Sequence, residues 1–315
     1  MNIRRKRLKL GTRGSPLALW QARHVSELLR RLDPSLEVEL ITIHTQAERF
    51  PESELAAIGV GVFTRELDEA LRRGEIDIVV HSLKDVPSEV PAELTIAAVP
   101  ERESPLDAFI SRDGTPLEAL PQGAKIGTGS PRRKAQLLAY RHDLEVVPLR
   151  GNVGTRLRKV EEQGLAGTVL AHAGLKRMDE ERRITQLIPP EILLPAVSQG
   201  ALAVLARASD RELCAFLSMI EHAPSRARVR AERGFLRRLR GGCQVPAGAL
   251  ATFTGAGGAA EELQLEAVVA APDGSASVRG ERTGSTSEPE ALGSRLAEDL
   301  LQRGADKILA PLGRG

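Results

Sequence analysis

Apolar positions near the N-terminus change from a strand-like to a helical spacing within a few residues. The segment RLKLGT at 7–12 alternates and predicts a strand, and Ser15 followed by Pro16 is typical of the cap and first residue of a helix. The apolar residues that follow recur every three or four positions: Ala18, Ala22, Val25, Leu29 and Leu32. We therefore expect a strand, a turn and a helix that ends at Asp33-Pro34.

The alternation of strand and helix continues through the first hundred residues. The segment 38–45 (VELITIHT) predicts a strand, 63–73 predicts a helix with Gly74 just past its end, and 76–82 (IDIVVHS) is an uninterrupted apolar strand. A strand without polar alternation is typical of a parallel sheet buried on both faces. The pattern indicates an α/β architecture.

One stretch of this pattern occurs twice. KLGTRGSPLALWQA at 9–22 is echoed by KIGTGSPRRKAQLLA at 125–139, and each predicts a strand, a turn, a Ser-Pro pair and a helix. Such self-similarity predicts two related α/β domains. The connections VPERESPLDAF (99–109) and LIPPEILLPAVSQG (187–200) are Pro-bearing, and two such crossings are typical of a hinged clamp that closes on a ligand.

The pattern changes after residue 222. A basic helix is predicted over 225–239, strands over 263–271 and 275–282, and a helix over 289–303, with GAGGAAEE (255–262) as a hairpin loop. These elements predict a third, smaller α+β domain. We expect three domains, formed by residues 1–100 plus 200–219, 106–194, and 222–315.

Composition excludes several functional classes. No apolar run approaches the roughly 20 residues of a membrane span, and no signal-peptide pattern follows the basic N-terminus, so we expect a cytoplasmic protein without a membrane partner. Aromatic residues make up 3% and the net charge is +2, which disfavours a nucleic-acid partner. The two cysteines exclude a disulfide framework, and the histidine spacing indicates no metal site. P-loop, dinucleotide and G-x-S-x-G motifs are also missing from the sequence.

Basic residues gather between 125 and 159, where the acidic residues are only Asp143 and Glu145. Arginine forks match carboxylate or phosphate groups, and helix N-termini favour anions. The arginines that stand beside glycine-rich turns therefore predict an anion site: Arg132, Arg133, Arg150 and Arg156. For Arg158 and Lys159 a solvated helix face is the better interpretation.

Two further positions each allow two interpretations. Asp85, with Lys84 beside it, follows the apolar strand that ends near 82, and ligands collect beyond the carboxyl ends of such strands. The pair could equally be an ordinary surface ion pair. Cys243 follows two glycines and lies close to arginines, which would lower the pKa of its thiol and favour a reactive thiolate. A loop cysteine without function is an equally good interpretation. Cys214, in an amphipathic helix, is expected to be a buried small hydrophobe.

Several segments together resemble a known family. TRGSPLALWQA, DIVVHSLKDVP, GTGSPRRKAQL, LRGNVGTRL, AGLKR and GGCQVPAGA resemble, in order and over nearly the whole chain, the signature segments of the porphobilinogen deaminases, also called hydroxymethylbilane synthases. The resemblance implies two α/β domains like those of periplasmic binding proteins, joined by a hinge, and a smaller α+β C-terminal domain. It also implies a monomeric transferase of tetrapyrrole and heme biosynthesis.

The implied reaction joins four porphobilinogen molecules head to tail into the linear tetrapyrrole hydroxymethylbilane and releases ammonia at each step. The implied cofactor is dipyrromethane, linked through a thioether to the cysteine of GGCQVP, which is Cys243 here. Because each pyrrole carries an acetate and a propionate, the growing chain needs many cationic partners.

The resemblance also implies roles for individual residues. Asp85 would be the catalytic carboxylate that stabilises cationic pyrrole species and moves protons. Besides Cys243, the cofactor would be bound by Lys84, Thr128, Ser130, Arg132, Arg133 and Arg156. The substrate would be bound by Arg13, Ser15, Gln21, Phe63, Arg150, Arg177 and Gln199.

The sequence departs from the family pattern in three places. The loop AAIGVGVF (56–63) lacks the family's lysines, TQAE (45–48) replaces T-x-G-D, and Leu205 stands where an acidic residue is common. Two hypotheses follow. The first is an active enzyme with an altered loop, and the alternative is a catalytically impaired relative that binds an anionic pyrrole or another polycarboxylate in a two-domain clamp.

Overall fold

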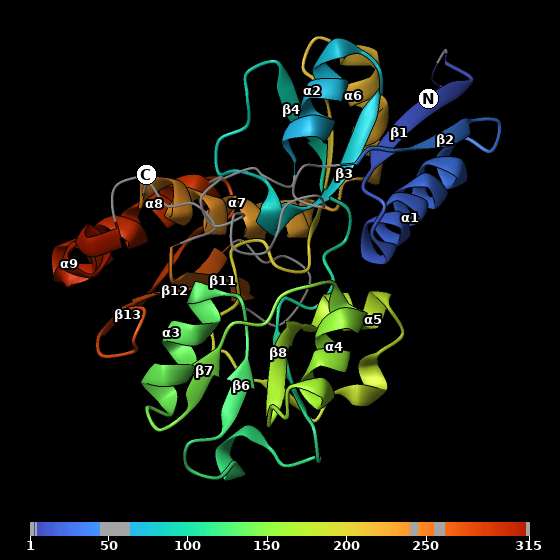
Figure 1. Ribbon diagram of the computed structural model, residues 1–315. Coiled ribbons are helices and arrows are strands. Elements are labelled where there is room, and N and C mark those ends of the chain that lie inside the picture. The colour runs from blue at the N-terminus through green and yellow to red at the C-terminus, as the bar shows by residue number, and fades with distance from the viewer. Residues whose placement is uncertain (1–2, 4, 45–63, 240–244, 255–261, 313–315) are drawn as a thin grey trace. The chain divides into compact units, whose positions relative to one another are not determined.

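Figure 1 shows a computed structural model of the chain, which describes residues 3, 5–44, 64–239, 245–254 and 262–312. The chain divides into two compact units: residues 1–103 with 201–226, and residues 104–200 with 227–315. The predicted boundaries of three domains stay a prediction. Among the described residues, no helix is long and apolar enough to cross a membrane.

The first unit is built on a five-stranded sheet in the order β2-β1-β3-β10-β4. Its strands are β1 (Arg7–Thr12), β2 (Glu37–Thr42), β3 (Ile78–Ser82), β4 (Leu94–Ala98) and β10 (Leu202–Arg207). β1 pairs in parallel with β2 and β3, whereas β10 is antiparallel to both of its neighbours. The sheet is therefore mixed, and not the parallel sheet that the apolar strand at 76–82 predicts.

Helices cover both faces of this sheet. α1 (Pro16–Leu32) and α6 (Arg211–Leu217) share one hydrophobic core with β1, β3 and β10, and α2 (Arg65–Arg73) contacts β1, β3 and β10 as well. The predicted start of α1 is confirmed: Ser15 is the N-cap, its side chain accepts the Ala18 N–H at 3.3 Å, and Pro16 is the first helical residue. Gly74 ends α2 with a φ of 75°, a conformation that favours glycine.

The second unit repeats the plan of the first. Its five-stranded sheet has the order β7-β6-β8-β5-β9, formed by β5 (Asp107–Ser111), β6 (Lys125–Gly127), β7 (Glu145–Val147), β8 (Gly167–Ala171) and β9 (Gln186–Ile188). The first three strands of this order are parallel, and the fourth is antiparallel to both neighbours, as in the first sheet. The helices α3 (Pro131–Tyr140), α4 (Val153–Glu162) and α5 (His172–Arg177) pack on it. The two sheets bear out the repeat seen in the sequence.

The antiparallel strand of each sheet follows a crossing between the units. β5 comes directly after the crossing near 103, and β10 comes directly after the crossing near 200. The strand at the fourth position in the order of each sheet, β10 or β5, thus belongs to a chain segment that has just left the other unit. The two predicted Pro-bearing connections are these crossings.

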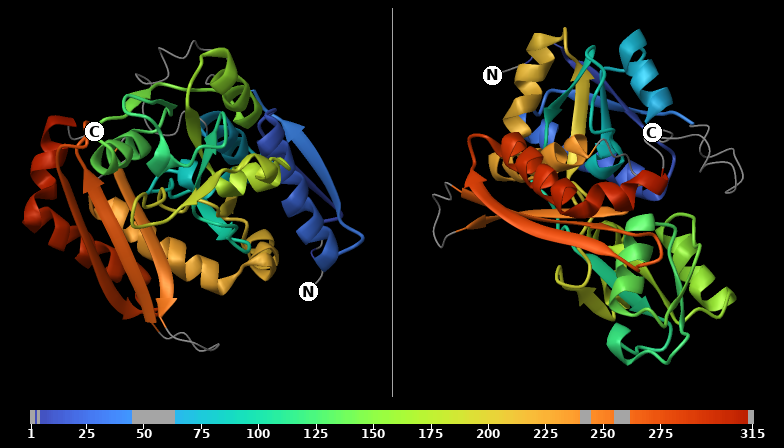
Figure 2. Two further views of the ribbon diagram at one scale, coloured as in Figure 1. Left: turned by 90° about the horizontal axis from the view of Figure 1, so that it is seen from below. Right: turned by 90° about the vertical axis from the view of Figure 1, so that its left-hand side faces the viewer.

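A three-stranded antiparallel sheet lies in the C-terminal part of the second unit. It is formed by β11 (Ala247–Thr254), β12 (Glu262–Ala270) and β13 (Ser277–Ser285), shown in orange in Figure 2. α7 (Ala223–Arg238) and α8 (Pro289–Leu300) share a hydrophobic core with it, and the chain continues through a helical turn at Leu301–Ala305 to α9 (Asp306–Leu309). The predicted fold class, two α/β parts and a smaller α+β part, is confirmed.

Two glycines provide a matched test of how closely α7 and α8 pack. A methyl group added at Gly293 of α8 would overlap the backbone of Ala231 and Phe235 of α7, whereas one added at Gly154 of α4 has only Asn152 Oδ1 nearby, at 3.7 Å. We expect Gly293→Ala to destabilise the protein by about 1–3 kcal/mol, because backbone atoms must move apart. Gly154→Ala should be neutral or stabilising, because alanine is the better helix former. Thermal melting of the two variants measures the difference, and equal melting temperatures would show that the helices do not pack this closely.

Candidate active site

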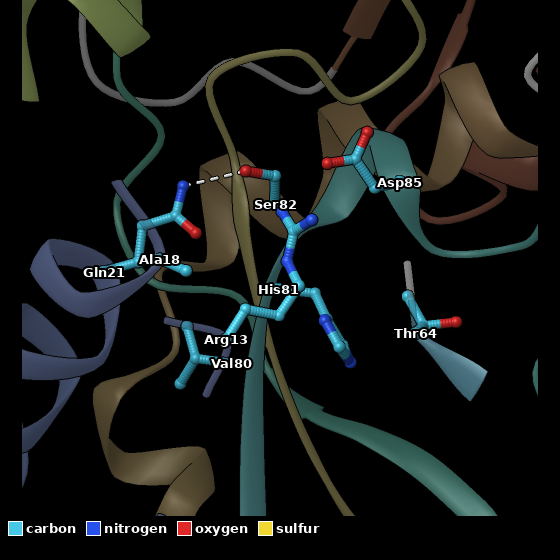
Figure 3. A pocket seen from close by; sticks show the side chains of 8 residues that line it. All are labelled: Arg13, Ala18, Gln21, Thr64, Val80, His81, Ser82 and Asp85. Atoms are coloured by element: carbon cyan, nitrogen blue, oxygen red, sulfur yellow. Dashed lines mark hydrogen bonds between the residues drawn. The ribbon is translucent and has the colours of Figure 1, made fainter. Parts of the chain in front are cut away.

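A small pocket lies in the first unit beyond the carboxyl ends of β1 and β3 (Figure 3). Arg13 follows β1, and Asp85 ends the short 3-10 turn Leu83–Asp85 that follows β3. Both line the pocket, and the guanidinium of Arg13 points toward the end of the pocket where the Asp85 carboxylate lies. The structure thus brings together two residues that are 72 positions apart and that the sequence singled out separately.

Gln21 joins α1 to the end of β3 inside this pocket. Its side chain is buried, and its Nε2 donates a hydrogen bond to Ser82 Oγ at 2.8 Å, as Figure 3 shows. This bond fixes the distance between the helix that begins after Arg13 and the turn that carries Asp85. Of the other predicted residues here, Ser15 caps α1 and Lys84 is half-buried in the turn, but neither lines the pocket.

His81 also lines the pocket, and the sequence analysis did not single it out. It is 5% exposed, and its Nε2 lies 3.4 Å from Asp68 Oδ1 of α2. Within the part of the chain that the structure describes, neither of these two buried atoms has a hydrogen-bond partner. The signal in the sequence was a histidine at the carboxyl end of an apolar strand. Leu205, in contrast, is a buried core residue of β10 opposite Val79, so an apolar side chain fits its place.

Arg132 and Arg133 meet an internal carboxylate in the second unit. Both are buried on α3 and both pair with Asp107, the fully buried first residue of β5, at 2.8 Å and 2.7 Å. Arg132 also donates to the carbonyl oxygen of Leu194 and Arg133 to that of Val169. These two arginines, predicted to bind ligand carboxylates, therefore already hold a carboxylate of the protein. The sequence analysis missed Asp107, an acid at the start of an apolar strand.

The two arginines determine the ionisation of Asp107. Complete burial by itself would raise the pKa of this carboxyl, but the positive charges of Arg132 and Arg133 outweigh burial and hold the pKa well below its ordinary value. Burial in turn lowers the pKa of Arg132. The cluster of two cations and one anion keeps a net positive charge.

Gln199 and Arg177 are both predicted to bind substrate; Gln199 contacts this cluster, and Arg177 contacts the residue that follows Gln199. Gln199 is 1% exposed, and its Nε2 donates to Pro105 O at 2.8 Å and to Asp107 Oδ1 at 3.0 Å. Arg177, on α5, is buried and donates to Gly200 O at 2.6 Å. Both side chains therefore serve the internal network, and both hold the segment just before β10.

The turn between β6 and α3 resembles the turn between β1 and α1. Ser130 is the N-cap of α3 and accepts the Arg133 N–H, and Thr128 Oγ1 accepts the Ser130 N–H at 3.2 Å. In the next turn, Arg156 Nε donates to Gly151 O at 2.7 Å, and Arg150 is half-buried.

The remaining residues singled out in the sequence lie on helix surfaces, in the first core or outside the described residues. Arg158 is exposed and paired with Glu162, as a solvated helix face requires, but Lys159 is half-buried and donates to Arg150 O at 3.2 Å. Cys214 is partly buried against the first core, and burial raises the pKa of its thiol. Cys243 and Phe63, like the loop 45–63, lie outside the described residues.

The Asp107 cluster makes a prediction about stability and pH. Asp107→Asn leaves two arginines buried without their anion, and we expect a loss of about 3–5 kcal/mol at pH 7. Because the folded pKa of Asp107 lies below the ordinary value of 3.8, its ionised form stabilises the fold above about pH 4, and this contribution is lost as the pH falls further. The difference between parent and variant should therefore shrink between pH 4 and pH 2.

Urea unfolding at several pH values measures this difference. Glu162→Gln removes an exposed ion pair and is the matched control, which should change stability little. If Asp107→Asn cost no more than this control at pH 7, the cluster would not be an important source of stability.

Comparisons with known proteins cover nearly the whole of this chain. Residues 8–215 match the family model described as "Porphobilinogen deaminase, dipyromethane cofactor binding domain", and residues 226–302 match "Porphobilinogen deaminase, C-terminal domain". Porphobilinogen deaminase of Pelotomaculum thermopropionicum is 50% identical over 306 residues, covering 97% of this chain and 96% of the relative. That of Desulforudis audaxviator is 51% identical over 312 residues, covering 99% of each chain.

Among solved structures, the periplasmic VFT2 domain of BvgS from Bordetella pertussis matches 68% of this chain and covers 86% of its own length, at 17% identity and a TM-score of 0.42. The two curated relatives, in contrast, are identical to this chain at about half of the aligned positions over almost its full length. With both family models matched in order along the sequence, the chain belongs to the porphobilinogen deaminase family.

Proposed function

We propose that the pocket lined by Asp85 and Arg13 is where this member of the porphobilinogen deaminase family joins four porphobilinogen molecules into a linear tetrapyrrole. The observation that carries this assignment is the position of Asp85, a half-buried carboxylate at the end of β3, in the same pocket as a guanidinium. Ligands of α/β sheets collect at such strand ends.

Asp85 is the residue proposed to act on the reacting atoms. When porphobilinogen loses ammonia, positive charge develops on its pyrrole ring. A carboxylate that accepts a hydrogen bond from the pyrrole N–H stabilises this charge, and the same carboxylate can hold the proton that is released when the new carbon–carbon bond forms. The turn Leu83–Asp85 keeps the carboxylate in place, because it follows directly on the buried strand β3.

Arg13 is proposed to bind a substrate carboxylate. Its guanidinium offers paired donors that match an acetate or propionate group. The Gln21–Ser82 hydrogen bond keeps α1 and the end of β3 together, so the substrate side chain and its pyrrole ring are held in one orientation. Gln21 thus contributes mainly by fixing the pocket.

Dipyrromethane is the cofactor that the matched family domain is named for. Its acetate and propionate groups need cations and hydroxyls, and the turns of the second unit offer Thr128, Ser130, Arg150 and Arg156, so this donor set fits the group. We propose that Cys243 carries the cofactor through a thioether, and that Lys84 also binds it. When bound, it supplies the free pyrrole carbon to which the first substrate molecule is joined.

Arg132 and Arg133 are proposed to act on the cofactor through charge. Two cations share one anion, Asp107, so the cluster keeps a net positive charge that attracts carboxylates to this end of α3. Their guanidinium groups are buried and engaged, so long-range attraction is their main contribution to binding. We also propose that the working protein is a monomer in the cytoplasm.

Asp85→Asn tests the catalytic role. The amide keeps the size of the side chain but loses its negative charge, and we expect kcat to fall by about 10²–10⁴ with an unchanged melting temperature. Porphyrin formed in acid after incubation with porphobilinogen measures turnover. Glu89→Gln, which removes an exposed carboxylate four residues along the chain, should keep parental kcat. An Asp85→Asn variant with near-parental kcat would rule out this role.

Cofactor attachment is tested by intact mass. The parent protein and Cys214→Ser should carry the added mass of two pyrrole units, and Cys243→Ser should lack it and be inactive. Adduct without turnover in the parent would favour an impaired relative that still binds the pyrroles. If the adduct persisted in Cys243→Ser, the attachment site would lie elsewhere.

A further inference from the structure

The backbone of Ser198 adopts a conformation that residues with a side chain rarely take. Its φ is 64°, in the left-handed region, and the residue is fully buried at the end of the second crossing between the units. Gly200, two positions on, also has a positive φ of 88°. A left-handed conformation costs free energy for serine but not for glycine, so contacts elsewhere must hold Ser198 in place.

A buried glutamate makes one of these contacts. Glu232, on α7, is 0% exposed, and its Oε2 accepts the N–H of Ser198 at 2.7 Å while its Oε1 accepts the N–H of Ala251 on β11 at 3.0 Å. A carboxylate is costly to bury, and hydrogen bonds to an ionised acceptor are strong. Glu232 therefore ties the left-handed turn to the sheet of the C-terminal part of the same unit.

The conformation of Ser198 determines where the next two residues lie. Gln199 donates to Asp107 Oδ1, which in turn holds Arg132 and Arg133. The carbonyl oxygen of Gly200 accepts a hydrogen bond from Arg177. A series of contacts thus leads from Glu232, through Ser198 and the two residues after it, to Arg132 and Arg133, which the proposed function assigns to the cofactor. The same series reaches Gln199 and Arg177, for which the family resemblance implies substrate binding.

We infer that Glu232 is a positioning residue for Arg132, Arg133 and Arg177, and that it acts by holding Ser198 in the left-handed conformation. The inference rests on the proposed function, because it assigns to Glu232 an effect on binding of porphobilinogen. It also explains why a helix of the C-terminal part buries an acidic side chain against a turn of the preceding crossing. Without the clamp, serine returns to an extended or right-handed conformation, and Gln199 leaves Asp107.

The experiment compares Glu232→Gln, Ser198→Gly and the double variant. An amide can accept only one of the two N–H groups and presents a donor to the other, so Glu232→Gln should raise the KM for porphobilinogen about tenfold. Glu232 makes further interactions, so this variant alone is not decisive. Glycine adopts the left-handed conformation without a clamp. Ser198→Gly should therefore leave KM within about twofold of the parent value and should restore KM of the double variant to within about threefold.

Hydrogen exchange supplies a readout that does not depend on turnover. The Ser198 amide should exchange at least tenfold faster in Glu232→Gln than in the parent. The matched control is Glu298→Gln, which removes a surface carboxylate paired with Arg238 near the end of α7, and it should change neither KM nor this exchange rate. A parent protein without turnover would refute the proposed function, and the exchange rates would still test the clamp.

Three results would overturn the inference. In the first, Glu232→Gln lowers the melting temperature but leaves KM and Ser198 exchange unchanged, which shows a purely structural role. In the second, the double variant is as impaired as Glu232→Gln. The third is that neither Glu232→Gln nor the double variant folds. Glycine at 198 needs no clamp, so the double variant should fold if holding Ser198 is the role of Glu232. If only the single variant fails to fold, recovery of folding and of KM in the double variant supports the inference.

Discussion

The carboxylate of Asp107 is the contact on which the second unit and its arginines depend. It is the first residue of β5, it receives Arg132 and Arg133 from α3, and it receives Gln199 from the segment that precedes β10. Burying a carboxylate or a guanidinium costs free energy, and a partner of opposite charge offsets this cost. The three charges therefore form one structural group, which joins both crossing segments to the sheet of the second unit.

The repeated plan of the two sheets explains where the chemistry is found. In each sheet, a Gly-Thr turn after a parallel strand leads to a serine N-cap and a helix that begins with proline. In the first unit this turn places Arg13 in the pocket with Asp85, and in the second unit it places Thr128 and Ser130 before the two buried arginines. Under the proposed function, the repeat would serve two tasks, a reacting site in one unit and carboxylate binding in the other.

The arginines predicted to bind ligands differ in how deeply they are buried. Arg132, Arg133 and Arg177 are buried and donate to groups of the protein itself, so they shape the site from within. Arg13 and Arg156 are half-buried beside turns, where a ligand can reach them more easily. In the proposed function the two groups complement each other, because a carboxylate-rich ligand needs both a positive field and direct donors.

Local sequence determined the elements and the family. Ser15-Pro16 and Ser130-Pro131 predicted two helix starts because capping depends only on neighbouring backbone groups, and the apolar strands followed from spacing alone. The ordered segments also predicted the porphobilinogen deaminase family, which the comparisons confirm. The basic residues after 125 predicted an anion site, which stays a prediction, and nothing local showed which of these residues face inward.

Only the tertiary structure decided which charges pair and how the sheets are completed. Asp107 lies about 25 positions from its arginines and about 90 from Gln199, and no periodicity links such distant residues. The antiparallel strands β5 and β10, the His81–Asp68 contact and the left-handed turn at Ser198 have the same origin. The sequence by itself determined which chemistry the chain carries, because capping, spacing and motifs act locally. The fold decided which side chains the protein uses to hold itself together, because burial and charge pairing depend on contacts between distant segments.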